Sequence, residues 1–171
     1  MAVVTTGKST AITNATATPR VLNTTGLAGG RVQRSIGFVT LANGDSATSI
    51  YRVARLPSNC YVDAIKLTCL DIGTTGTADI GLYYPTTHSN GGTVIDVDAF
   101  ASNVNFHGGS IDVDVDYESG AAAGLITNAE KRLWERAGLT SDPGGEFDLV
   151  LGLAADTDAA GTILVRVYFV C

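Results

Sequence analysis

The chain has few charged side chains, few histidines and no long apolar run, and each shortage disfavours a class of protein. Charged residues make up 16% of its 171 residues, against roughly a quarter in an average protein. Its 11 Lys and Arg residues are scattered and its net charge is −6, so we expect no nucleic-acid partner, because phosphate binding needs clustered basic side chains. No stretch approaches the ~18 apolar residues of a membrane span, and no signal-peptide pattern is present, so we expect no membrane partner.

The three cysteines lack the spacing of a metal site. No C-x-x-C pair exists, which disfavours zinc. Cys60 and Cys69 stand near the two ends of one apolar run, and a strand of that length would hold them too far apart to pair. We therefore expect both to be small buried side chains and Cys171 to be a free C-terminal thiol, as suits assembly in a reducing cytoplasm.

Apolar residues nonetheless make up 45% of the chain, which is enough for one domain with a sizeable core. A surface rich in Thr, Ala and Gly but poor in charge favours a protein that buries much of its surface against neighbours. A small soluble monomer with a polar but uncharged surface is the alternative, and the composition leaves both open.

From Arg31 onward, short runs of apolar residues, several of them alternating with polar ones, predict β-strands. The strands are expected at residues 31–41, 47–56, 61–70, 77–85, 110–117, 146–155 and 162–170, with a further short strand and a loop within 93–109. Asn43-Gly44 predicts a hairpin between the first two strands, and 61–70 is apolar enough to be buried on both faces. About eight strands without alternating helices indicate an all-β fold, a jelly-roll-like antiparallel β-sandwich that spans residues 31–171.

The same patterns predict the core and one short helix. Alternation with a period of two places these side chains inside: Ile80, Leu82, Val113, Val115, Leu149, Leu151, Val165 and Val167. The helix is expected at residues 128–138, with Asn128 as its N-cap and Gly138 just past its end. Trp134 on that helix is expected to anchor it to the core or to an interface.

Residues 1–30 differ from the rest and are expected to form an extended N-terminal arm. They include eight Thr, no aromatic and no acidic residue, and Lys8 and Arg20 are their only charged side chains. Their apolar surface is too small to offset the entropy of folding alone, yet they lack the charges of a solvated tail. They form either a floppy terminus or an arm that lies on another protein surface. On the second interpretation, the contacting residues are Val3, Val4, Ile12, Arg20, Val21 and Leu22.

The stretch GSIDVDVDYESG, residues 109–120, places Asp112, Asp114 and Asp116 on one face of a predicted strand. It is not an EF-hand loop, which would need Gly and Glu where Tyr117 and Ala123 stand. Side chains on one strand face are also spaced about 6–7 Å apart, which is too far for all three to hold one ion. A solvent-facing strand is the first interpretation, and a contact with a partner's basic residues or a bound cation are the other two.

No catalytic, metal-binding or cofactor-binding residue is predicted. His88 and His107 both stand in loop sequences with no acid or Cys at ligand spacing, so we expect surface or turn histidines. The chain contains no nucleophile elbow and no phosphate-binding loop. We therefore expect the protein not to be an enzyme.

Three segments resemble the capsid decoration proteins of tailed bacteriophages, also called cement or head-stabilising proteins. They are RLPSNCYVDAIKLTCLDIGTTGTADIGLYYP, GGTVIDVDAFASNV and EKRLWERAGLTSDPGGEFDLVLGLAADTDAAGTILVRVYFV, and together they cover most of residues 45–170. The resemblance implies a β-sandwich or jelly roll on the outer capsid surface, often a homotrimer, that is made in the host cytoplasm. It implies two partners, the major capsid protein and other copies of the chain, and no catalytic residue.

Two other classes of function stay open. A carbohydrate- or receptor-binding sandwich of a phage fibre or head appendage would need exposed aromatic side chains, and Tyr83, Tyr117 and Trp134 are the candidates. A small hydrolase or cupin-like enzyme would need several histidines on inward-facing strand positions, which two loop histidines do not supply.

Overall fold

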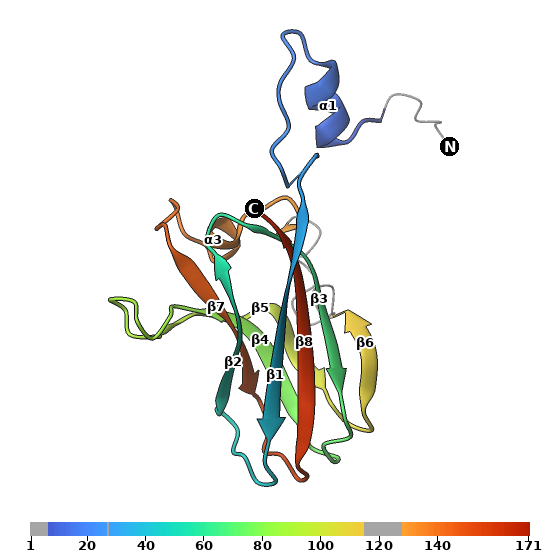
Figure 1. Ribbon diagram of the computed structural model, residues 1–171, viewed down its shortest axis with the longest axis vertical. Coiled ribbons are helices and arrows are strands. Elements are labelled where there is room, and N and C mark those ends of the chain that lie inside the picture. Colours follow the sequence, from blue (N-terminus) through green and yellow to red (C-terminus); the bar gives the residue numbers. More distant parts are fainter. Residues whose placement is uncertain (1–6, 27, 115–127) are drawn as a thin grey trace.

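The computed structural model describes residues 7–26, 28–114 and 128–171, and for residues 110–114 it describes the backbone. Two four-stranded antiparallel sheets face each other across one core (Figure 1). The first sheet has the strand order β1-β8-β3-β6, and the second has β2-β7-β4-β5. The strands are β1 (Val32–Leu41), β2 (Ile50–Pro57), β3 (Tyr61–Cys69), β4 (Thr77–Tyr83), β5 (Val94–Asn105), β6 (Ser110–Asp114), β7 (Glu146–Leu153) and β8 (Gly161–Val170).

This strand order is that of a jelly roll. Every paired strand is antiparallel, and most connections carry the chain from one sheet to the other. Eight strands in two Greek keys give this arrangement, in which each sheet turns one face to the core. The predicted jelly-roll-like antiparallel β-sandwich is therefore confirmed.

The core lies between the sheets and is built from alternate residues of each strand. Six of the eight predicted core side chains are buried: Ile80, Leu82, Leu149, Leu151, Val165 and Val167. The Val113 side chain and Val115 lie outside the described part of the chain. Phe100, Phe106 and Phe147 are the largest buried side chains.

The predicted hairpin between the first two strands is wrong. The turn exists, and Gly44 has the positive φ of 84° that favours glycine, but β1 pairs with β8 while β2 pairs with β7. The turn therefore carries the chain from one sheet to the other. At Gly37 an added Cβ would collide with the Val53 carbonyl, so the glycine lets β1 and β2 approach closely at this edge.

Two other strands differ from expectation. Residues 94–105 form one long strand rather than a short strand and a loop, because β5 absorbs extra residues in bulges at three places along its pairing with β4. In β3 the Ile65, Leu67 and Cys69 side chains are buried, while Lys66 and Thr68 on the other face are half-buried. The prediction that both faces of 61–70 are buried is therefore wrong.

The helix predicted at 128–138 is reduced to the single turn of α3 (Leu133–Arg136). Arg132 occupies the N-cap position in place of Asn128, and its backbone N–H donates to the Glu135 carboxylate at 2.9 Å. Gly138 follows the end with φ of 72°, as predicted. Trp134 packs against the core, also as predicted.

The cysteine prediction is wrong in one respect. Cys69 is a free buried thiol as expected, but Cys60 and Cys171 form a disulfide. Tyr61 and Val170 are paired residues of β3 and β8, so the chain end lies beside the start of β3. Because disulfides persist mainly in oxidising surroundings, the inference of a reducing cytoplasm from a free Cys171 loses its premise.

The arm is less extended than predicted. Residues Thr10–Thr16 form the short helix α1, whose N-cap Ser9 accepts the Ile12 N–H through its side chain. The chain then returns alongside, and the Asn14 side chain donates to Asn23 at 2.9 Å. No residue of α1 is buried, so hydrogen bonds rather than a core hold this structure together. In Figure 1 the arm projects from one end of the sandwich.

Candidate functional site

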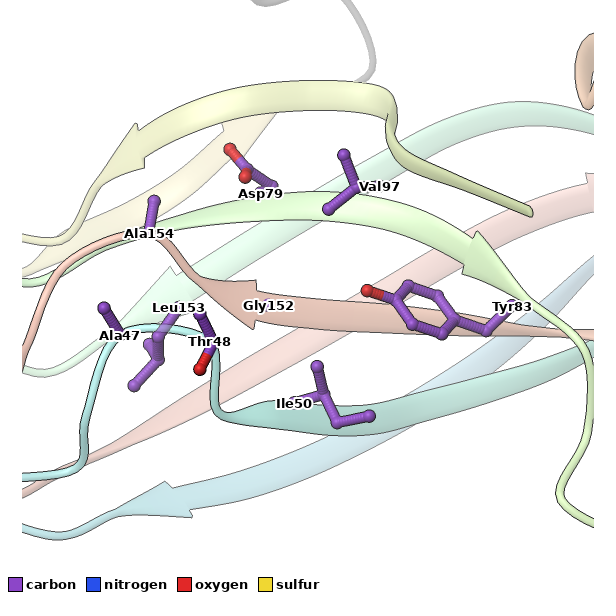
Figure 2. A pocket seen from close by; sticks show the side chains of 9 residues that line it. All are labelled: Ala47, Thr48, Ile50, Asp79, Tyr83, Val97, Gly152, Leu153 and Ala154. Carbon is purple, nitrogen blue, oxygen red and sulfur yellow. The ribbon is translucent and has the colours of Figure 1, made fainter. Parts of the chain in front are cut away.

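The outer face of the second sheet contains a hollow of about 360 Å³. Its lining comes from the β1–β2 loop and from all four strands of that sheet (Figure 2). Gly152 on β7 leaves the space open, because a Cβ there would meet only the Ile50 side chain, at 4.0 Å. Gly81 on β4 lets the β5 backbone cross above it, since a Cβ at 81 would collide with the Asp96 and Val97 carbonyls.

The hollow combines apolar walls with the polar side chains of Thr48, Asp79 and Tyr83. Ile50 and Val97 stand on its rim, each about half exposed at 48% and 47%. Asp79 and Tyr83 project from β4 toward the same space (Figure 2). The Asp79 carboxylate accepts the Asn103 N–H at 2.8 Å and forms no ion pair with any residue that the structure describes. Burial raises the pKa of the Tyr83 hydroxyl, the positive charge of Arg52 opposes this rise, and the Asp79 charge adds to it.

Beside the hollow, a buried carboxylate fixes two arginines. Asp148 on β7 is 2.8 Å from the Arg52 guanidinium and 2.6 Å from that of Arg55. Arg52 also donates to the carbonyls of Tyr84 and Gly92 at 3.1 Å and 2.9 Å. Through Arg52, the network therefore holds both ends of the β4–β5 connection against the sheet, and we interpret its role as structural.

A third carboxyl group with an altered environment lies on β5. Burial raises the pKa of Asp96, and a hydrogen bond with the Asp98 side chain raises it further. The positive charge of Arg136 acts in the opposite direction. The sequence pattern singled out neither aspartate; both fall within 93–109, where a short strand and a loop were expected.

At the opposite end of the sandwich from the arm, short acidic side chains join the connecting loops. Asp158 accepts the Thr74 hydroxyl at 2.7 Å and its backbone N–H at 2.8 Å, and these bonds lower the pKa of its carboxyl. Asp45 accepts the Tyr51 hydroxyl, which lowers the pKa of Asp45, while burial and Asp45 raise that of Tyr51 to about 12. These hydrogen bonds join neighbouring loops, so we interpret both carboxylates as structural.

The root of the arm is fixed against the body. An added Cβ at Gly26 would collide with the Tyr61 ring, and one at Gly30 would collide with Val170. The Arg132 guanidinium lies 5.7 Å from the Tyr61 ring centre and donates to its hydroxyl at 3.1 Å. Close packing at two glycines therefore sets the direction in which the arm leaves the sandwich.

Beyond its root, the arm presents the side chains that the sequence predicted as contacts. Ile12, Val21 and Leu22 are 51%, 49% and 83% exposed, and Arg20 is exposed too. Val3 and Val4 lie outside the described residues. These side chains are therefore available for contact with another surface.

The aspartate strand is placed in part. Asp112 and Asp114 belong to β6, and Asp114 pairs with Lys66 of β3 in the backbone register. Asp116 lies outside the described residues, as do the side-chain surroundings of the other two. The choice among solvent, partner and cation therefore stays a prediction.

The other candidate residues are placed as follows. His88 lies in the β4–β5 loop and stacks on Tyr84, with ring centres 4.6 Å apart, and His107 is exposed in the loop before β6. Tyr117 lies outside the described residues. Across residues 7–26, 28–114 and 128–171, no group of three His, Cys, Asp or Glu side chains has the geometry to hold a metal ion. The helices in this part of the chain are too short and too polar to cross a membrane.

An exposed apolar row on β1 was missed by the sequence reasoning. Val32, Ile36 and Phe38 lie on the outer face of the first sheet and are 54%, 44% and 69% exposed. The alternation in 31–41 is the signal that could have found it, because both faces of that stretch carry apolar residues.

No protein-family model and no curated protein sequence matches the chain. Among solved structures, a chain in the capsid of Ralstonia phage GP4 matches with a TM-score of 0.59 and 18% identity, over 84% of this chain and 86% of that one. A chain in the cyanophage Pam1 capsid asymmetric unit matches with a TM-score of 0.45 and 17% identity, over 83% and 86%. At such identity, the likeness to the phage GP4 chain shows that the two share a fold.

Proposed function

We propose that this chain is a structural virion protein that binds the outer surface of a phage capsid and stabilises it by bridging major capsid protein subunits. It acts without catalysis, as a homotrimer that decorates the assembled shell. The observation that carries the proposal is the arm, whose root is fixed on the sandwich while its apolar side chains are exposed.

Two further observations support the proposal. The jelly roll is shared with a chain in the capsid of Ralstonia phage GP4, and the segments quoted above resemble decoration proteins. The charge content of 16% also suits a protein that covers much of its surface with neighbours.

The arm suits bridging for an energetic reason. Ordering a chain costs roughly 1–2 kcal/mol per residue, so an arm becomes ordered along its length only against a large surface. In a symmetric shell, the same contact is repeated at every equivalent position, and a modest area per copy then stabilises the whole particle.

Deleting residues 2–25 tests the proposal. The sandwich keeps its core and the arm root at Gly26, so we expect an unchanged circular-dichroism melt and strongly reduced occupancy on purified particles. Occupancy is measured by gel densitometry against the major capsid protein. Full occupancy by the truncated chain would falsify the proposal.

A pair of matched substitutions refines the test. Val21 in the arm and Val94 on the sandwich are 49% and 51% exposed, so changing either to Ser removes a similar apolar surface. We expect Val21→Ser to lower occupancy and Val94→Ser to leave it unchanged. Equal losses from both would argue against a specific role for the arm.

The hollow favours one alternative, a carbohydrate- or receptor-binding module of a phage fibre or head appendage. A carboxylate and a phenol in a shallow depression can hydrogen-bond sugar hydroxyls. Tyr83 is only 8% exposed, however, and Trp134 packs against the core, so neither offers a broad stacking surface. Binding on a glycan array that is lost in Asp79→Ala would favour this alternative, and an array without signal would remove it.

A further inference from the structure

We propose that the hollow on the second sheet receives Arg20 from the arm of a second copy of this chain, with Val21 and Leu22 covering its apolar rim. The inference deepens the proposed function, on which it rests in taking the arm as a contact between molecules. It assigns the arm an acceptor site and names the residues on both sides.

The composition of the hollow matches one long basic side chain. Such a side chain has an apolar stem and a charged tip, so it is best accommodated where apolar walls lead to a carboxylate. Here Ile50 and Val97 form the walls and Asp79 supplies the carboxylate (Figure 2). The volume of about 360 Å³ lies near the lower limit of small-molecule sites, roughly 300–1,000 Å³, and so suits a single side chain with its neighbours.

The Asp79 carboxylate has capacity for a charged donor. One of its oxygens accepts the Asn103 N–H, and no described residue forms an ion pair with it. Arg52, which lies 5.7 Å from the Tyr83 ring centre, is neutralised by Asp148 and directed toward loop carbonyls. An incoming guanidinium would therefore meet a carboxylate that forms no ion pair with any described residue of its own copy.

Charge complementarity selects the arm as the occupant. The arm carries Lys8 and Arg20 and no acidic residue, so its net charge is +2. The remaining nine basic and 17 acidic residues give residues 31–171 a net charge of −8. Opposite charges on two parts of one chain favour contact between the arm of one copy and the body of another.

Arg20 is the better fit of the two basic residues. The Lys8 ammonium already donates to Thr16 within the arm, at 3.2 Å. Arg20 is exposed and is followed directly by Val21 and Leu22, the latter being 83% exposed. The triplet therefore matches a carboxylate flanked by two half-exposed apolar side chains, and a guanidinium can bond a carboxylate with two N–H groups at once.

The geometry makes this a contact between copies. The arm root lies at the start of β1, and the loop that lines the hollow follows the end of β1. Ten residues of strand separate the two by about 33 Å. The packed root at Gly26 and Gly30 directs the arm away from the sandwich, as Figure 1 shows. Such a head-to-tail contact uses two different surfaces, and it closes into a ring when its rotation allows, as a trimer requires.

A photocrosslinking experiment on the full chain tests the assignment. Val97 is replaced by p-benzoylphenylalanine, equal amounts of normal and ¹⁵N-labelled chains are mixed, and crosslinked peptides are identified by mass spectrometry. The reaction is run in concentrated solution and on purified particles. We expect peptides containing residues 20–22 joined to position 97 across differently labelled chains. Crosslinks confined to single chains, or to other segments or the capsid protein, would overturn the inference.

Charge exchange supplies the second measurement. We expect Asp79→Arg and Arg20→Asp each to weaken self-association in sedimentation velocity by about tenfold, and the double variant to recover most of the loss. The control pair exchanges exposed residues outside the hollow, Asp63→Arg with Arg31→Asp, and should change association little. Absence of recovery in a double variant with a normal melt contradicts the pairing.

Filling the hollow provides a test that does not depend on charge. Gly152→Leu projects a side chain into the open space and leaves the core face of β7 unchanged, and Thr40→Leu on the first sheet is its matched control. We expect Gly152→Leu to prevent crosslinking and Thr40→Leu to leave it unchanged.

If the inference fails but residues 2–25 are still needed for occupancy, the arm binds elsewhere and the proposed function stands. If crosslinking succeeds while the truncated chain occupies capsids fully, the proposed function fails and the inter-copy contact remains.

Discussion

Removing the Cys60–Cys171 disulfide should destabilise the protein strongly. The bond joins residues 111 positions apart, and in the chain-entropy account the constraint on the unfolded chain grows with the logarithm of that separation. For this loop the relation gives about 5 kcal/mol as an upper value, and about 3–5 kcal/mol after allowance for structure in the unfolded state. At roughly 2–4 °C per kcal/mol for a chain of this size, the melting temperature should fall by about 6–20 °C.

The assay compares thermal and urea unfolding of the wild type and Cys171→Ser, each with and without a reductant. We expect the reductant to lower the stability of the wild type to near that of Cys171→Ser, and to leave the variant unchanged. Cys69→Ala serves as the control, because Cys69 is a free buried thiol and its loss should not remove the response to reductant. The reasoning is refuted if the oxidised wild type and Cys171→Ser unfold together, or if mass mapping of the native protein finds Cys171 alkylated.

Three further predictions follow from the charged groups. Asp148→Asn should cost about 2–3 kcal/mol in unfolding free energy, because it leaves the guanidinium groups of Arg52 and Arg55 without their buried partner, whereas the exposed Glu146→Gln should cost under about 0.5 kcal/mol. Folding lowers the pKa of the Asp158 carboxyl, so this group should stabilise the protein at any pH above its unfolded-state pKa and lose that effect as the pH falls through its folded-state pKa. Urea denaturation between about pH 2.5 and 7 measures this loss, and Asp158→Asn should make the unfolding free energy fall less steeply at acid pH. Asp112→Asn with Asp114→Asn should leave the melt nearly unchanged, and a large drop in melting temperature of the wild type on adding a chelator would indicate a bound cation instead.

The strands could be predicted because their information is local. Alternation of apolar and polar residues placed Ile80 and Leu82 on one face, and the same holds for Val165 and Val167. Pairing could not be predicted in the same way. A turn sequence such as Asn43-Gly44 reverses the chain, but the sheet that receives the next strand depends on partners that are distant in the sequence, since Pro57 pairs with Glu146 and Val32 with Val170.

The helix at 128–138 was overestimated for a tertiary reason. The backbone N–H groups of Leu133 and Trp134 donate to the carbonyls of Cys60 and Ser58, at 2.8 Å and 3.1 Å. A helix begun at Asn128 would have used these two donors internally, so the loop between β2 and β3 competes with it. Local propensity is a weak guide where another segment supplies acceptors in this way.

The hollow could not be predicted from the sequence for a different reason. The alternation that puts Ile80 and Leu82 in the core implies that Asp79 and Tyr83 lie on the opposite face of β4, but nothing local marks that face as hollowed. The depression depends on a glycine at 152 on β7 and on the extra residues that carry Val97 of β5 across Gly81. Such a surface arises only when all four strands of the sheet and the β1–β2 loop come together. For the arm the opposite holds. The sequence alone shows that residues 1–30 carry basic but no acidic side chains, whereas the acidic site proposed to receive them becomes visible only in the folded structure.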